Sequence, residues 1–72
     1  MRHTEIQSIG FPKRLFTLAK AERWIKKHGF KIKTIEITTH FYHFRQFEPN
    51  RKKKFRTEKL PNGVEFTYQI ND

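Results

Sequence analysis

Positive charge is concentrated in one stretch of this sequence, from residue 45 to residue 59. Seven basic residues fall there against only Glu48 and Glu58, and the middle of the stretch reads R-K-K-K-F-R. Arginine contacts phosphate through paired hydrogen bonds, and lysine acts on it as a point charge. The stretch therefore predicts a nucleic-acid-binding surface on a protruding basic β-hairpin, made of Arg45, Arg51, Lys52, Lys53, Lys54, Arg56 and Lys59. Phe47 or Phe55 could stack on a base.

The same charges have a simpler explanation, because charged edge strands also prevent aggregation. A further group of cations is predicted on the outer face of a helix: Lys20, Arg23, Lys26 and Lys27. Such a face is usually only solvated. The sequence does not tell whether the two basic surfaces merge. No base-reading motif accompanies them, so binding is expected to be non-specific and directed at the phosphate backbone.

No constellation of catalytic or metal-binding residues is found. His40 and His43 stand three apart, which on one strand places them on opposite faces, and the chain has no cysteine. The carboxylates are scattered, and the only aspartate is Asp72. Neither paired carboxylates nor an activated nucleophile can be identified. We therefore expect no catalytic residue, no metal and no cofactor, and a protein that is not an enzyme.

The overall composition favours a polyanionic partner. In 72 residues, 16 Lys and Arg stand against seven Asp and Glu, a formal charge of +9. Eight Phe, two Tyr and one Trp argue against a disordered basic tail. No apolar run approaches the roughly 20 residues that a membrane span requires. We expect no membrane association and an intracellular location, with nucleic acid, DNA or RNA, as the partner. An acidic protein partner and homo-oligomerisation remain open.

One amphipathic helix is predicted between Thr17 and Phe30. Its apolar arc repeats at helical spacing and consists of Leu18, Ala21, Trp24, Ile25 and His28. Thr17 is a suitable N-cap. Gly29 is a natural left-handed residue after the helix, and Phe30 would complete a Schellman motif by packing back on Ile25.

The rest of the chain predicts strands. We expect them at 3–11, at 35–47 with a bulge near 38–40, at 52–60 and at 64–70. Gly10 suggests a bulge or a close backbone approach. Asn62-Gly63 between two strand-like runs predicts a hairpin. The expected fold is α+β, a single two-layer domain over 1–72 in the order β-α-β-β-β, with one helix on an antiparallel sheet.

Read as a string, the chain resembles a small domain of large DNA viruses and of phage head and prohead-protease-associated proteins. The resembling pattern is A-x-x-W-x-K-K-H-G-F-K, then F-Y-x-F-R-Q-x-x-P, then N-G-V. His43 departs from it, because the pattern has arginine there. The resemblance implies a viral or phage origin and a virion or genome-associated role, in the host cytoplasm or nucleus or in the virion. The matching positions are Ala21, Trp24, His28, Gly29, Phe30, Phe41, Tyr42, Phe44, Arg45, Gln46, Pro49, Thr57, Asn62, Gly63 and Val64.

A second resemblance is to the HicA family of mRNA interferase toxins. Lys27-His28-Gly29-Phe30 precedes Thr38-Thr39-His40 at a spacing similar to that of the toxin's helix and catalytic histidine. It implies a ribonuclease in which His40 is catalytic. The chain departs from this family in lacking Gly-Ser before the histidine and in ending on a strand-like run. Three hypotheses follow: a nucleic-acid-binding protein, a protein–protein module such as a minor virion or assembly component, and a HicA-like ribonuclease.

Overall fold

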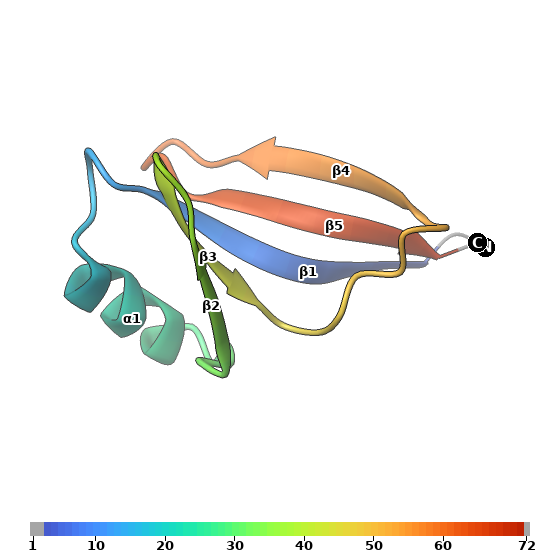
Figure 1. The fold of residues 1–72 in the computed structure, drawn as a ribbon, viewed down its shortest axis with the longest axis horizontal. Helices are drawn as coiled ribbons and strands as arrows, with labels where there is room; N and C mark the ends of the chain where they lie inside the picture. The colour runs from blue at the N-terminus through green and yellow to red at the C-terminus, as the bar shows by residue number, and fades with distance from the viewer. Residues whose placement is uncertain (1–2, 72) are drawn as a thin grey trace.

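The computed structural model describes residues 3–71, which form one helix packed against a five-stranded antiparallel sheet (Figure 1). The predicted α+β class is therefore confirmed. Along the sheet the strand order is β2-β3-β1-β5-β4. The elements are β1 (His3–Pro12), α1 (Leu18–Lys27), β2 (Thr34–Ile37), β3 (Phe41–Arg45), β4 (Lys54–Lys59) and β5 (Glu65–Asn71).

The expected order β-α-β-β-β is wrong by one strand, because residues 34–47 form two strands instead of one bulged strand. The chain reverses between Thr38 and Phe41. The Thr38 amide donates to the Phe41 carbonyl (2.9 Å), and the Phe41 amide donates to the Thr38 hydroxyl (3.1 Å). Ile37 then pairs with Tyr42. The apolar residues change phase along the chain here because a turn places both runs on one face.

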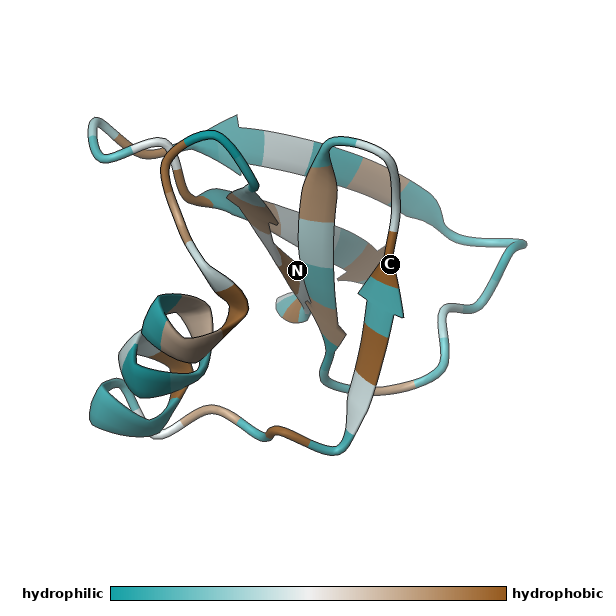
Figure 2. Cartoon of the chain, turned by 60° about the vertical axis from the view of Figure 1, so that its left-hand side comes forward, coloured by the Kyte–Doolittle hydropathy of each residue, from teal (hydrophilic) through white to brown (hydrophobic). Residues whose placement is uncertain are grey.

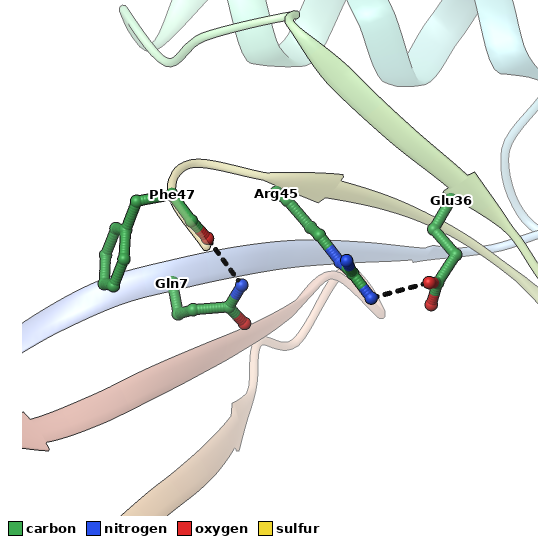
Figure 3. Close-up of polar contacts among 4 residues, drawn as sticks. All are labelled: Gln7, Glu36, Arg45 and Phe47. Carbon is green, nitrogen blue, oxygen red and sulfur yellow. Dashed lines mark hydrogen bonds and ion pairs between the residues drawn. The ribbon is translucent and has the colours of Figure 1, made fainter. Parts of the chain in front are cut away.

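β1 contains the bulge that the sequence led us to consider, but at a different residue. Its pairing with β5 shifts register between Ile6 and Ser8, so Gln7 is the extra residue. The shift puts Ile6 on the same face as Ile9, which explains their imperfect alternation. The Gln7 side chain turns inward, is 5% exposed and donates to the Phe47 carbonyl at 2.9 Å (Figure 3).

The other explanation for Gly10, a close backbone approach, is confirmed. A Cβ on Gly10 would lie 3.0 Å from two ring atoms of His43, on the neighbouring strand β3.

The helix begins and ends as predicted. Thr17 is the N-cap, and its hydroxyl accepts a hydrogen bond from the Lys20 amide (3.2 Å). Gly29 has φ +76°, and the Phe30 amide donates to the Ile25 carbonyl at 3.0 Å. Both are features of a Schellman motif. The helix is thereby fixed in length by its own sequence.

The core lies between α1 and the sheet. The fully buried residues are Ile9, Phe11, Ala21, Ile25, Phe44 and Val64. The Phe11 ring is central: its centroid lies 5.2 to 5.6 Å from those of Phe16, Trp24 and Phe44, each at a steep angle. Edge-to-face contacts of this kind add to the burial itself. The apolar side of α1 faces these strands, and its outer side is hydrophilic (Figure 2).

The strands that flank the basic stretch do not pair with each other. β1 and β5 lie between β3 and β4, so the predicted hairpin from Arg45 to Lys59 is wrong. Residues 46–53 connect β3 to the edge strand β4, past β1 and β5. β4 pairs with β5 through the turn at Asn62-Gly63, where the hairpin was expected. The Val64 amide donates to the Asn62 side chain at 3.1 Å, and Gly63 has φ +93°.

Candidate functional site

Most of the predicted basic stretch forms the outer edge of the sheet. Among residues 3–71, β4 has β5 as its only neighbouring strand, and all six of its residues are exposed. The loop before it contributes exposed Arg51 and Lys52 and half-buried Lys53. We call the cations of this edge the basic ridge: Arg51, Lys52, Lys53, Lys54, Arg56 and Lys59. Glu58 is the one carboxylate within it.

The cations of β4 project to both sides of the sheet. Residues that pair across antiparallel strands share a face. Arg56 pairs with Tyr68, on the face that carries the core, and its guanidinium carbon lies 5.3 Å from the Tyr68 ring centroid. Lys59 and Phe55 alternate onto the opposite face, where Phe55 is 41% exposed. The ridge is therefore an edge with charge on both flanks rather than a flat patch.

A buried glutamine holds the loop that begins the ridge. Gln69 is 6% exposed, and its side-chain oxygen accepts from the Asn50 amide at 2.8 Å. Asn50 in turn accepts from the Lys52 amide with its side chain (3.0 Å) and from the Lys53 amide with its carbonyl (2.9 Å). These bonds fix the backbone from which the lysines project. Sequence reasoning missed Gln69, since nothing local connects it to the loop.

Arg45, the first member of the predicted site, is not part of the ridge. It lies on β3, separated from β4 by β1 and β5. Its guanidinium forms an ion pair with Glu36 at 2.6 Å (Figure 3). Glu36 can reach Arg45 because β2 lies beside β3. The Gln46 side chain bonds to backbone, accepting from the Lys31 amide (2.9 Å) and donating to the Lys31 carbonyl (3.1 Å).

The secondary basic face is exposed but stands apart from the ridge. Lys20, Arg23, Lys26 and Lys27 are all exposed on α1. In both views the helix lies beneath one end of the sheet, and β4 forms the far edge (Figures 1 and 2). The two surfaces do not form one continuous patch, which answers a question that the sequence left open.

The histidines lie in three different environments. His28 is the C-cap of α1 and stacks on Trp24 with ring centroids 3.8 Å apart. His40 is exposed in the turn between β2 and β3. His43 packs over Gly10 on the face away from the helix. Burial lowers the pKa of His43, the carboxylates of Glu36 and Glu65 oppose that fall, and the Arg45 guanidinium adds to it. Within residues 3–71, no three His, Asp or Glu side chains gather in a metal-binding group.

A hollow of about 190 Å³ lies where three connections meet at one end of the sheet. β1 leaves there for the helix, β2 turns into β3, and β4 turns into β5 (Figure 1). We call it the strand-end pocket. Four of its lining residues carry basic or imidazole side chains: Lys13, Arg14, His40 and Lys59. The others are Pro12, Phe41 and Gly63, and none of the lining residues is acidic. The pairing of strands that are distant in the chain brings these turns together, so the pocket could not be foreseen from the sequence.

A second hollow, of about 300 Å³, lies beside Gln46 and is lined by residues 31, 33 and 34 and by residues 45–48. It contains Lys31, Lys33 and Arg45, but also Glu48. Arg45 is already paired with Glu36. The charge of this second hollow is therefore more nearly balanced than that of the strand-end pocket.

No helix within residues 3–71 is long and apolar enough to cross a membrane. No family model, curated protein or solved structure matches the chain.

Proposed function

We propose that this protein binds nucleic acid non-specifically, through contacts between the basic ridge and backbone phosphates. The observation that carries the proposal is that three cations on the exposed edge strand β4 and three in the loop before it stand together with a single carboxylate among them. β4 rises about 3.4 Å per residue, so its cations span several phosphates of an extended strand. Arg45 is left out of this proposal, because it is paired with Glu36 on the other side of the sheet.

Two features of the edge suit a polyanion. The cations flank both sides of β4, so a backbone lying along the edge meets positive charge on either hand. Phe55 is exposed on the flank that carries Lys59, where a base could stack on it. Nothing along the edge combines the donors and acceptors needed to read base edges, so the proposed contacts are with phosphate.

The test is fluorescence anisotropy of labelled duplex DNA, single-stranded DNA and RNA over a series of salt concentrations. Each neutralised phosphate contributes about 0.9 to the slope of log affinity against log salt for duplex, and about 0.7 for single strands. Changing Lys52, Lys53 and Lys54 to Glu is expected to lower that slope by about 2 to 3 and to weaken binding to all ligands.

The matched control carries the same three charge reversals on the helix, at Lys20, Lys26 and Lys27. It is expected to retain most of the affinity if the ridge is the interface. Equal losses in the two variants would mean that only net charge matters, and full binding by the ridge variant would remove the ridge from the proposal.

A protein–protein module is the second candidate, favoured by the outer edge of β4, which has no strand partner among residues 3–71. An acidic strand could add to such an edge through backbone hydrogen bonds. Absence of oligonucleotide binding at low salt would favour this candidate. Sedimentation would then separate self-association, as in a virion or assembly component, from binding of an acidic partner.

The ribonuclease ranks third. His40 is exposed in a turn, and within residues 3–71 no hydrogen bond orients its imidazole. A general base needs such an orientation or a substrate that supplies it. RNA cleavage that the His40→Ala change abolishes would restore this candidate.

A further inference from the structure

We propose that the strand-end pocket binds a phosphate monoester, and that in a bound nucleic acid this group is the terminal phosphate. The assignment to a terminal phosphate rests on the proposed function, because a nucleic-acid strand that follows the basic ridge would end at this pocket. The first part, that the pocket accepts a phosphate monoester, stands on the pocket alone.

The charges around the pocket are available to a ligand. Within residues 3–71, the side chains of Arg14, Lys59 and His40 make no hydrogen bond or ion pair. Lys13 is different, because its ammonium lies 5.4 Å from the Tyr42 ring centroid and would have to leave that contact to enter the pocket. Cations that converge on a hollow without counter-charges raise its positive potential.

One carboxylate, that of Glu65, stands next to the pocket in the strand register. Glu65 is the cross-strand neighbour of Lys59, but it does not line the pocket. It acts on His43, whose pKa it raises against the effect of burial. Because Lys13, Arg14 and Lys59 line the pocket, it keeps an excess of positive charge even when Glu65 is counted.

The size of the pocket suits a chemical group rather than a whole ligand. At about 190 Å³ it is smaller than the roughly 300–1,000 Å³ of sites that enclose drug-sized molecules. It corresponds to about six water molecules at roughly 30 Å³ each. Pro12 and Phe41 give it an apolar wall beside the cations. A phosphate fits among the cations, with the attached sugar against that wall.

The position of the pocket relative to the ridge favours a strand terminus. Lys59 belongs to both, and Lys54 lies about 17 Å away along β4 at 3.4 Å per residue. A backbone that follows the edge therefore reaches the pocket. A phosphate monoester carries about −1.5 to −2 charge near neutrality, whereas an internal diester carries one. A site with several free cations gains more from the monoester.

The experiment compares oligonucleotides of one sequence that carry a 5′-phosphate, a 3′-phosphate or hydroxyls at both ends. At 0.15 M salt we expect one phosphorylated form to bind roughly fivefold to tenfold more tightly than the hydroxyl form, as a charge-assisted contact would give. Equal affinity of all three forms would overturn the terminal assignment.

Two variants with the same loss of charge locate the effect. Arg14→Gln is expected to abolish the preference for the phosphorylated form while leaving hydroxyl-form binding nearly unchanged. Lys54→Gln, away from the pocket, is expected to weaken both forms alike and keep the preference. A preference that survives Arg14→Gln would place the terminal phosphate elsewhere and overturn the proposal. Arg14 is exposed, so its replacement leaves the core intact.

A titration with inorganic phosphate and with a nucleoside monophosphate, followed by NMR, separates this inference from the proposed function. Shifts at the amides of His40, Lys59 and Gly63 that Arg14→Gln removes would support the pocket even if no oligonucleotide binds. Oligonucleotide binding without such shifts and without terminal preference would leave the ridge and overturn the pocket. A response to the nucleotide alone would identify a free nucleotide as the source of the phosphate.

Discussion

Two glycines adopt left-handed backbone conformations, at Gly29 and Gly63. They differ in their surroundings. A Cβ at Gly29 would have no atom within 4 Å, whereas a Cβ at Gly63 would lie 2.7 Å from a methyl carbon of Leu15 and 3.4 Å from Pro12. The pair therefore separates backbone strain from steric contact.

We predict that Gly29→Ala lowers the free energy of unfolding by about 1 to 2 kcal/mol, from backbone strain alone. Gly63→Ala should lower the free energy of unfolding further, because the steric contact with Leu15 adds to the backbone strain. Urea denaturation of both variants measures the difference. Leu15 is 48% exposed, so Leu15→Ala can be combined with Gly63→Ala to remove the contact and recover the excess. An equal fall in the free energy of unfolding for the two variants would show that the Leu15 side chain moves away without destabilising the fold.

The His43 environment predicts how stability changes with pH. Burial holds the pKa of His43 below its ordinary value of 6.5, so the unfolded chain binds a proton more readily than the folded one. The stability that this group contributes is complete above pH 6.5 and falls as pH drops from there toward the folded pKa. Thermal unfolding between pH 7.5 and 5 should show this loss in the native protein.

His43→Gln is the variant for comparison, because an amide fills similar space without titrating. Its unfolding should depend less on pH over this interval. An unchanged pH dependence would assign the effect to other groups.

At the scale of elements, the loop of the basic ridge depends on a strand that lies behind it. We predict that Gln69→Leu lowers the free energy of unfolding by about 1 to 3 kcal/mol, because the Asn50 amide loses its acceptor. Amide hydrogen exchange from residue 50 to residue 53 should accelerate as well. The control is Asn71→Ala, which removes the 3.0 Å contact of Asn71 with the Gln69 side chain but leaves the Asn50 bond. Equal exchange in the two variants would contradict the role of Gln69.

How far each element could be predicted depends on the range of the interactions that define it. The helix was predicted in full because Thr17, Gly29 and Phe30 act on backbone groups within a few residues. The Asn62-Gly63 turn was found for the same reason. The turn at 38–41 was missed because it has no glycine, proline or asparagine; a threonine hydroxyl closes it instead.

The candidate site divides in the same way. The exposed cations of the ridge are visible in the sequence as a run of charge. The insertion of β1 and β5 between β3 and β4 is not, because strand pairing across the sheet depends on long-range packing. Arg45 was grouped with the ridge for that reason, and the strand-end pocket and Gln69 could not be foreseen.

At the scale of the whole molecule, the helix face and the basic ridge lie on separate parts of the surface (Figure 1). We predict that charge reversals on the two surfaces affect oligonucleotide binding independently. Combining the Glu changes at Lys52, Lys53 and Lys54 with those at Lys20, Lys26 and Lys27 should give additive losses, within about 0.5 kcal/mol. Anisotropy of a short duplex at fixed salt measures each loss. A clear departure from additivity would mean that the ligand contacts both surfaces at once.

The order of the strands also bears on how the protein folds as it is synthesised. In the part of the chain that the structure describes, β4 pairs only with β5, and β5 is made after it. Until residues 65–71 leave the ribosome, β4 has no strand to join, and β1 lacks the neighbour on its β5 side. Pairing between strands that are distant in the chain is slow, whereas α1 and the β2–β3 turn need only local contacts. Within this sheet, the basic edge is therefore the last part to take shape on a nascent chain.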